Sequence, residues 1–474
     1  MICENFAYPK LMSFFEEISA IPRPSYHEER ITAYLVEFAK KRGLEYYSDE
    51  IGNVLINLPA TEDKKDLPAV LLQGHTDMVC EKNEGVEHDF MNDPLKLYVA
   101  DGWLRAKGTT LGADNGVAVA AMLALLDGIS DSHRALQCLF TVSEEVGLDG
   151  AKAFDYSKIY ARKMINMDSA DEKLITAGCA GGLRSNFVLP VVREAQTGNA
   201  LKIKVKGLFG GHSGEDIHRG RANANKLLGR VLYRLKMEDS ELRLVSVSGG
   251  SKENAIPREA EATFVTSKVA ELTSLIANIS EEISAELCKD DKDFTLIVEN
   301  AKAEYAPMNQ LGTDKVIFVL DNMDNGVFEV NQELGLVEFS RNLGVIDTDA
   351  DNVEFTISSR SARESQLDFS AQQIDSYAAL LGGTSDHYNR YPGWIYAEDS
   401  AVRSEYIAAF CKLFGEEPTV EVIHAGLECG IIKQAIADMD MISCGPVIVN
   451  LHSPDEALNL ASLERFFTVI LNVL

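Results

Sequence analysis

The sequence predicts an α/β protein in which a mostly parallel sheet carries helices on both faces and an α+β domain is inserted into the chain. The chain has 474 residues, which is too long for one ordinary domain. Apolar strands and helices alternate near both of its ends, a pattern typical of parallel sheets. The middle segment is richer in strands. We therefore expect a discontinuous domain formed by residues 1–183 and 396–474, and an inserted domain of residues 184–395.

The elements of the discontinuous domain follow from apolar spacing and capping residues. A helix is expected from Lys10, and a second one from the capping box Ser25-x-x-Glu28 to Gly43. Further expected elements are strands 53–58 and 69–74, a buried helix 112–126, and strands 135–142 and 164–167. After Ser400 the pattern predicts a helix to Phe414, strand 419–423, helix 429–436, strand 441–443 and a helix from Pro454 to Leu474.

The inserted segment combines strands with two long helices, 221–235 and 269–287. The second of these helices follows a strand at 259–265, and a similar strand at 352–358 precedes a helix that begins at Phe369. A strand-turn-helix unit thus occurs twice, which predicts an inserted domain made of two related halves.

Charge and composition exclude several classes of protein. Asp and Glu number 73 against 45 Lys and Arg, so the formal net charge is −28, and such a surface repels nucleic-acid phosphates and anionic lipids. The longest apolar run, Val117 to Leu126, is shorter than the roughly 18 residues that cross a bilayer. Eight scattered cysteines form no C-x-x-C pair, which argues against disulfides and thiolate metal sites. We expect a cytoplasmic protein that binds neither nucleic acid nor membranes.

Histidines and carboxylates stand where successive predicted elements begin or end. They are His75 and Asp77, Asp114, Glu144 and Glu145, Asp168, and His452. Each has a plain structural reading as a strand end, a helix N-cap or a surface loop. Their joint occurrence at the edge of an open sheet, with no thiol among them, indicates a ligand site instead.

The spacing of these residues suits metal chemistry. His75 and Asp77 are two residues apart on an extended chain, so they share a face and the carboxylate can fix the imidazole tautomer. Asp114 precedes an apolar helix whose dipole favours an ionised carboxylate there. Glu144 and Glu145 repel each other unless a cation or a proton lies between them.

This pattern resembles that of the co-catalytic dinuclear zinc peptidases, a family that includes aminoacylases, glutamate carboxypeptidases and cytosolic dipeptidases. The inserted domain, between the fourth and fifth ligand positions, is also a feature of the family. Four further segments resemble the aminoacyl-histidine dipeptidases (Xaa-His dipeptidases or carnosinases): Gly210-Gly211-His212-Ser213-Gly214-x-x-Ile217-His218, Arg221-x-Asn223-Ala224-Asn225-Lys226, Asn254-Ala255-Ile256-Pro257-Arg258 and Gly426-Leu427-Glu428-Cys429-Gly430.

The resemblance implies two Zn²⁺ ions per chain, with Mn²⁺ or Co²⁺ as substitutes. His75 and Asp168 would hold one ion, Glu145 and His452 would hold the other, and Asp114 would bridge them. In similar enzymes a cis peptide bond follows the bridging carboxylate, and we expect one here.

The resemblance also implies the catalytic roles. Asp77 would orient His75, and Glu144 would be the general base that activates a zinc-bridged hydroxide. His212, in a glycine-rich loop of the inserted domain, would donate a hydrogen bond to the oxyanion, although a buried structural histidine is an alternative interpretation.

Substrate recognition is expected in the inserted domain and in the segment around Glu428. Asn254 and Arg360 are candidates for binding the terminal carboxylate of a dipeptide, since arginine forms paired hydrogen bonds to carboxylates. A solvated surface arginine is the alternative, and two-residue periodicity leaves open whether Arg360 or Arg363 points inward.

The resulting hypothesis is a dinuclear zinc dipeptidase that cleaves Xaa-His dipeptides, including β-alanyl-histidine (carnosine). The inserted domain would act as a lid that closes over the dipeptide and as the contact of a homodimer. An N-acyl amino acid deacylase or a tripeptidase of the same family is an alternative with the same metal site. A non-catalytic peptide-binding protein is a third, which the complete ligand set together with Glu144 disfavours.

Overall fold

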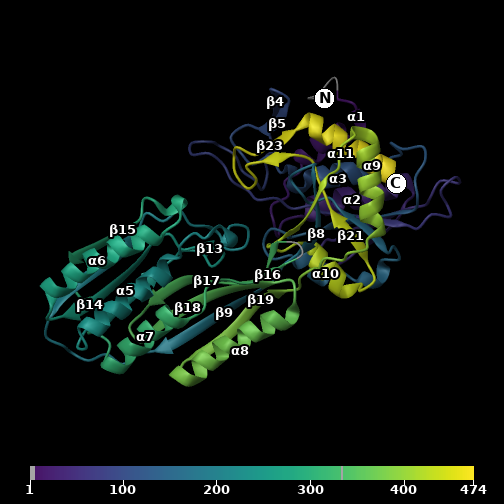
Figure 1. Ribbon diagram of the computed structural model, residues 1–474. Coiled ribbons are helices and arrows are strands. Elements are labelled where there is room, and N and C mark those ends of the chain that lie inside the picture. The colour runs from purple at the N-terminus through teal and green to yellow at the C-terminus, as the bar shows by residue number, and fades with distance from the viewer. Residues whose placement is uncertain (1–5, 333–334) are drawn as a thin grey trace. The chain divides into compact units, whose positions relative to one another are not determined.

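The computed structural model describes residues 6–332 and 335–474, which form two compact units (Figure 1). Unit 1 contains the described residues up to Cys179 together with Trp394–Val422 and Leu427–Leu474. Unit 2 contains Ala180–Gly393 and the short segment Ile423–Gly426. Each unit has its own hydrophobic core.

Unit 1 is built on an eight-stranded sheet with the order β1-β2-β6-β3-β7-β21-β8-β20. The four central strands are parallel: β6 (Leu136–Thr141), β3 (Val70–His75), β7 (Lys163–Asn166) and β21 (Asp440–Ser443). The outer strands are β1 (Glu45–Ser48), β2 (Val54–Leu58), β8 (Leu174–Cys179) and β20 (Thr419–Ile423). β2 and β8 pair with the central strands in antiparallel orientation. The prediction of a mostly parallel sheet is therefore confirmed by the four central strands.

Helices bury the centre of this sheet. Every residue of β3 and β6 is buried, so both faces of these strands are covered. The helices of unit 1 are α1 (Pro9–Ser19), α2 (Glu29–Arg42), α3 (Ala113–Leu126), α4 (Asp149–Ala153), α9 (Ala401–Phe414), α10 (Glu428–Ala435) and α11 (Leu460–Val473). A second, small sheet has the order β22 (Ile448–Val449), β23 (Ala457–Asn459), β5 (Trp103–Ala106) and β4 (Leu97–Ala100).

The predicted capping box at the start of α2 is wrong. The helix begins at Glu29, and its N-cap residue Glu28 makes no capping hydrogen bond through its side chain. The Ser25 hydroxyl donates to Asp77 at 2.8 Å, while Glu28 accepts from the backbone N–H and the hydroxyl of Ser143, each at 2.8 Å. These tertiary partners replace the local cap.

The last helix is shorter than the sequence predicts. Residues Ala457–Asn459 form β23 and pair with β5, so α11 begins only at Leu460. Asn459 caps it by accepting a hydrogen bond from the backbone N–H of Ser462. The seven described cysteines are free thiols, and Cys3 lies outside the described residues.

Unit 2 is an antiparallel sheet with helices packed against it. The strand order is β15-β10-β14-β12-β17-β18-β9-β19, and β16 pairs with β17. Its strands are β9 (Gly181–Pro190), β10 (Asn199–Lys206), β12 (Arg243–Gly249), β14 (Ala260–Thr266), β15 (Thr295–Asn300), β16 (Gly326–Asn331), β17 (Leu336–Thr348), β18 (Asn352–Ser361) and β19 (Thr384–Tyr391). The short strands β11 (Gly211–His212) and β13 (Ala255–Ile256) pair separately.

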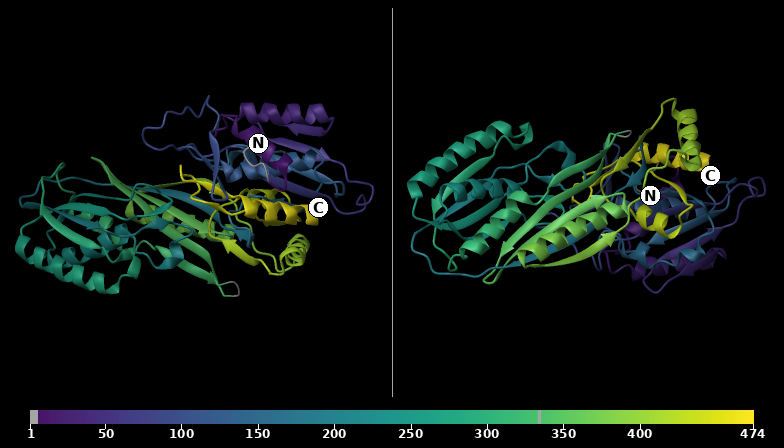
Figure 2. Two further views of the ribbon diagram at one scale, coloured as in Figure 1. Left: turned by 90° about the horizontal axis from the view of Figure 1, so that it is seen from above. Right: turned by 60° about the horizontal axis from the view of Figure 1, so that its bottom comes forward.

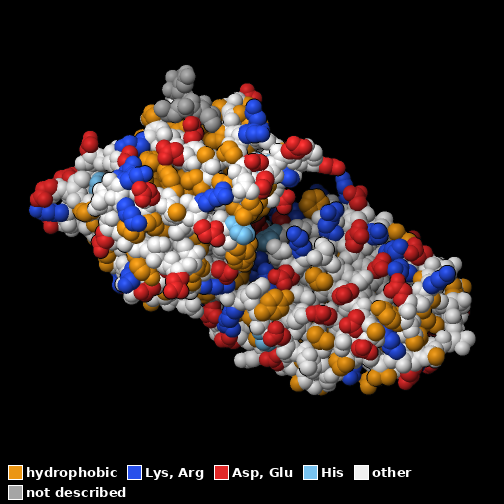
Figure 3. Space-filling model, turned by 180° about the vertical axis from the view of Figure 1, so that it is seen from behind, with side chains coloured by type: hydrophobic (Ala, Val, Ile, Leu, Met, Phe, Trp, Pro, Cys, Tyr) orange, Lys and Arg blue, Asp and Glu red, His pale blue; other side chains and the backbone are white. Residues whose placement is uncertain are grey.

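Four helices cover this sheet: α5 (Ala224–Glu238), α6 (Val269–Glu286), α7 (Gln310–Asn322) and α8 (Glu364–Leu381) (Figure 2). The strand-helix unit that the sequence contains twice is present as β14 with α6 and as β18 with α8. Acidic and basic side chains are interspersed over the face drawn in Figure 3. Among the described residues, no helix is both long enough and apolar enough to span a membrane.

Candidate active site

Asp77 connects two of the loops that follow strands of unit 1. His75 is the last residue of β3, and its Nδ1 lies 3.3 Å from Asp77 Oδ1. Asp77 also accepts hydrogen bonds from the backbone N–H groups of Glu144 (3.0 Å) and Glu145 (3.2 Å) and from the Ser25 hydroxyl. Burial acts to raise the pKa of Asp77, but these bonds and His75 outweigh it and lower the pKa. Asp77 therefore orients His75 and the glutamate loop together.

Asp114 lies between two histidines at the start of α3. Its Oδ1 is 3.1 Å from His75 Nε2, and its Oδ2 is 3.3 Å from His452 Nε2. The peptide bond between Asp114 and Asn115 is cis, as the resemblance predicts. A carboxylate that turns one oxygen toward each histidine has the arrangement of a bridging ligand.

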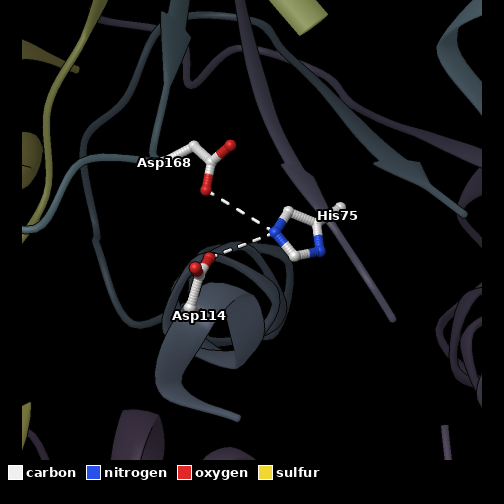
Figure 4. A group of neighbouring side chains, drawn as sticks. All are labelled: His75, Asp114 and Asp168. Carbon is white, nitrogen blue, oxygen red and sulfur yellow. Dashed lines mark hydrogen bonds and ion pairs between the residues drawn. The ribbon is translucent and has the colours of Figure 1, made fainter. Parts of the chain in front are cut away.

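Two further carboxylates complete the cluster. Asp168 Oδ1 lies 3.6 Å from His75 Nε2 (Figure 4). The same oxygen accepts a hydrogen bond from Asn115 Nδ2 at 3.0 Å. On the other side of Asp114, Glu145 Oε1 lies 3.1 Å from His452 Nε2. The nitrogen and oxygen atoms thus form two groups that share Asp114.

The structure brings together the seven histidines and carboxylates that stand where successive predicted elements begin or end. Three groups have donor atoms within 4.8 Å of one another: His75, Asp114 and Asp168; Asp114, Glu145 and His452; and His75, Glu144 and Glu145. The first two are the ligand sets that the resemblance implies. Imidazole nitrogen and carboxylate oxygen are donors that suit Zn²⁺ and accept Mn²⁺ or Co²⁺.

The charges of the cluster also fit cations. Burial, together with the neighbouring carboxylates of Asp168 and Glu145, raises the pKa of Glu144 well above its usual value, and burial raises the pKa of Asp168. Hydrogen bonds with Asp114 and Glu145 raise the pKa of His452 to about 10. Because its carboxylates are clustered, the site without metal binds protons, and divalent cations would displace these protons.

Glu428 is a buried carboxylate beside this cluster. It lies at the start of α10, is fully shielded from solvent, and its Oε2 accepts hydrogen bonds from Thr141 Oγ1 (2.8 Å) and Gln73 Nε2. Its other oxygen, Oε1, has no hydrogen-bond partner among the described residues. Burial raises the pKa of Glu428 to about 7. A positively charged partner would satisfy this unpaired oxygen.

Unit 2 contains Arg360 and Arg363, and the sequence left open which of them points inward. The Arg363 side chain is 52% exposed, and its Nε lies 2.9 Å from Glu338 Oε1. Arg360 is only 4% exposed, donates to the Tyr391 hydroxyl at 3.0 Å, and forms no ion pair with any described carboxylate. Arg360 is therefore the inward-pointing arginine, a buried cation with no carboxylate of the described residues at ion-pair distance.

His212 lies next to Arg360, with Nε2 3.4 Å from Arg360 Nη2. Its Nδ1 accepts a hydrogen bond from the backbone N–H of Glu215 at 3.2 Å, whereas its Nε2 faces a guanidinium that can only donate, so the two contacts favour opposite tautomers of the neutral ring. Burial and the charge of Arg360 lower the pKa of His212 to about 4, which keeps the ring neutral at pH 7. A neutral imidazole still offers one N–H group as a hydrogen-bond donor.

Asn254 differs from the other candidates, because its side chain is exposed and its contact with the loop is a backbone one. Its carbonyl accepts a hydrogen bond from the N–H of Ser213 at 2.8 Å. His424 lies in no motif that marks it in the sequence, and its Nε2 lies 2.7 Å from Ser340 Oγ. Burial and the charge of Arg360 lower the pKa of His424 to about 3. Its position four residues before Glu428 was the only available signal.

Comparisons with known proteins identify the family of this chain. Residues 71–474 match the family described as Peptidase family M20/M25/M40. The chain is 39% identical over 470 residues to the cytosol non-specific dipeptidase of Escherichia coli (strain K12), covering 98% of this chain and 96% of the relative.

Two solved structures are similar along nearly the whole chain. The aminoacylhistidine dipeptidase from Vibrio alginolyticus has a TM-score of 0.91 at 36% identity, with 99% of this chain and 96% of that chain covered. Aminopeptidase PepT from Bacillus cereus ATCC 10987 shares the fold, with a TM-score of 0.57 at 16% identity and coverage of 99% and 98%. The chain therefore belongs to peptidase family M20/M25/M40, as the resemblance of its motifs predicts.

Proposed function

We propose that this protein is a dinuclear zinc dipeptidase that hydrolyses Xaa-His dipeptides, including β-alanyl-histidine (carnosine). Membership of the peptidase family and the two dipeptidase relatives support the reaction class. The observation that carries the proposal is Asp114, whose two oxygens each face a different histidine-carboxylate group. The native cation, Zn²⁺ rather than Mn²⁺ or Co²⁺, is part of the proposal.

Five residues would hold the two ions: His75 and Asp168 on one side, Glu145 and His452 on the other, and Asp114 between them. When bound, such a pair supplies Lewis-acid activation of water and of the scissile carbonyl. The ions would also neutralise a cluster in which carboxylates outnumber histidines.

Glu144 is the general base in this proposal. Its backbone N–H is fixed by Asp77, and its carboxylate lies in the donor group with His75 and Glu145. Glu144 takes a proton from the attacking water and passes it to the nitrogen of the leaving amine. His212 would donate a hydrogen bond from its ring N–H to the oxygen of the carbonyl under attack, as the resemblance implies.

Two side chains would recognise the charged ends of a dipeptide in this proposal. The buried Arg360 has no ion-pair partner among the described residues and would bind the terminal carboxylate in paired hydrogen bonds. The unpaired Oε1 of Glu428 would accept a hydrogen bond from the terminal ammonium. Asn254 would support the His212 loop through its carbonyl. An N-acyl amino acid has no ammonium group, so Glu428 favours a dipeptide substrate over that alternative.

The test is an assay of the zinc-loaded protein against carnosine, other Xaa-His dipeptides, dipeptides without histidine, tripeptides and N-acetyl amino acids. We expect the highest kcat/KM for Xaa-His dipeptides. Equal rates for dipeptides without histidine would reduce the proposal to a general dipeptidase, consistent with the name of the E. coli relative. Faster hydrolysis of N-acetyl amino acids or tripeptides would favour the deacylase or the tripeptidase.

A homodimer that forms through the inserted domain, and the action of that domain as a lid, stay predictions. Light scattering on the intact protein tests the first, because a dimer doubles the mass of the 52.1 kDa chain. We also propose a cytoplasmic location, which the name of the E. coli relative supports. Fluorescence microscopy of a tagged chain in its source cell would test it.

A further inference from the structure

A single buried carboxylate holds the turn that carries Asp114. Glu456 is 2% exposed and accepts hydrogen bonds from four consecutive backbone N–H groups. Its Oε2 lies 2.8 Å from the nitrogen of Leu111 and 2.9 Å from that of Gly112. Its Oε1 lies 2.9 Å from the nitrogen of Ala113 and 3.3 Å from that of Asp114. Glu456 thus fixes the backbone from which the shared carboxylate projects.

Arg23 holds the same turn from another direction. It is 2% exposed and lies in unit 1 beside the end of β3. Its Nη1 donates to the carbonyls of Thr76 (2.9 Å) and Asp77 (3.2 Å), and its Nη2 donates to the carbonyl of Gly112 at 2.6 Å. One guanidinium therefore ties the segment after His75 to the turn before Asp114.

The close approach of Arg23 explains why glycine occupies position 112. Gly112 has a φ of +65°, and a Cβ at this position would lie 2.6 Å from Arg23 Nη2 and 2.7 Å from the sulfur of Met78. Both the backbone conformation and the space therefore require glycine. The turn is built around the arginine.

We propose that Glu456 and Arg23 are positioning residues that set the Asp114 carboxylate between the two cations. Neither side chain contacts a predicted metal ligand through that ligand's side chain. Glu456 binds the backbone of the segment that carries Asp114, and Arg23 binds the backbone of that segment and of the one that follows His75. The inference rests on the proposed dinuclear site. It predicts that replacing either residue lowers the affinity for metal without lowering the Tm of the metal-free protein below that of a matched control.

The chemistry of the side chain explains why a carboxylate is needed. An ionised carboxylate only accepts hydrogen bonds and has about four acceptor positions, which match the four N–H groups at Glu456. In Glu456→Gln one oxygen becomes an NH₂ group, which would face two N–H donors. Either the Leu111 and Gly112 pair or the Ala113 and Asp114 pair would lose its acceptor and move.

The experiment is a calorimetric Zn²⁺ titration of the metal-free protein, together with its thermal unfolding. Loss of an outer partner of a metal ligand typically weakens metal affinity roughly 10- to 100-fold, and we expect a loss of this size for Glu456→Gln. The matched control is Glu172→Gln, which removes another buried carboxylate of unit 1, one paired with Arg465 and making no contact with residues 111–114. The control should bind zinc like the wild type.

The two readouts separate the outcomes. Weaker zinc binding in Glu456→Gln, with a Tm of the metal-free protein no lower than that of the control, supports the proposal. Wild-type zinc affinity with a lowered Tm would show a purely structural role and overturn it. If Glu456→Gln does not fold, the same titration of Arg23→Lys decides in the same way, because one ammonium cannot serve three carbonyls in the guanidinium geometry. Failure of the wild type itself to bind two zinc ions would instead refute the proposed function.

Discussion

Arg360→Ala is expected to remove the recognition of the substrate's terminal carboxylate without affecting metal content. Arg360 is 4% exposed and has no ion-pair partner among the described residues, so a bound carboxylate would be its counter-ion. A charge-assisted hydrogen-bonded pair of this kind contributes about 1.5 to 3 kcal/mol. Because 1.36 kcal/mol corresponds to a factor of ten, kcat/KM for a dipeptide should fall roughly 10- to 150-fold.

The assay is a cycle in which the enzyme and the substrate are changed separately and together. Steady-state rates are measured for a dipeptide and for its C-terminal amide with the wild type and with Arg360→Ala. Amidation should lower kcat/KM of the wild type about as much as the substitution does, and it should lower kcat/KM of the variant little further. The matched control is Arg363→Ala, since Arg363 is exposed and paired with Glu338, and its rates should stay within about twofold of the wild type.

An equal fall in kcat/KM on amidation for the wild type and for Arg360→Ala would refute this reasoning. The carboxylate would then bind elsewhere, and the unpaired guanidinium would need another explanation. Damage of the same size in Arg363→Ala would refute the assignment based on burial.

Three further outcomes are expected. Glu144→Gln should keep both metals and lose at least about a hundredfold in kcat, the usual scale for a general base; loss of zinc in proportion to activity would make Glu144 a ligand. Glu428, whose pKa rises from its usual 4.5 to about 7, binds more protons folded than unfolded between these values, so its stabilising contribution is present below pH 4.5 and is lost as the pH rises to 7. Metal-free Glu428→Gln should therefore gain Tm over the wild type at pH 8 but not at pH 4.5, and an equal gain at both would contradict the shift. Removing metal with a chelator should abolish hydrolysis, and added Zn²⁺ should restore it; hydrolysis that survives complete metal removal would contradict a metal-dependent reaction.

Strand ends made much of the fold and of the metal cluster predictable. The parallel centre of the sheet gathers the ends of β3, β6 and β7 at one edge, so short local motifs were enough to predict that His75, Glu144 and Asp168 lie together. Family resemblance added Asp114 as the shared carboxylate. Both kinds of signal are local in sequence, and that is why they could be recognised.

Features that depend on tertiary partners could not be predicted in this way. The motif Ser25-x-x-Glu28 has the pattern of a capping box, but its side chains bond to distant residues instead. Ser25 donates to Asp77, and Glu28 accepts from Ser143. Arg360 and Arg363 differ in burial because β18 ends at Ser361, between the two.

Other residues could not be recognised from local motifs, because their partners lie far away in the sequence. Glu456 stood within a predicted helix, and its four hydrogen-bond donors lie about 340 residues away along the chain. His424 is similar, since its partner Ser340 is 84 residues away. Only the folded structure relates such residues to the site.

Anomalous diffraction from crystals of the zinc-loaded protein tests the central claim most directly. We expect two zinc peaks about 3.5 to 4 Å apart, each contacted by one oxygen of Asp114. His75 and Asp168 should contact one ion, and Glu145 and His452 should contact the other. A single fully occupied peak, or two peaks that do not share Asp114, would contradict the account.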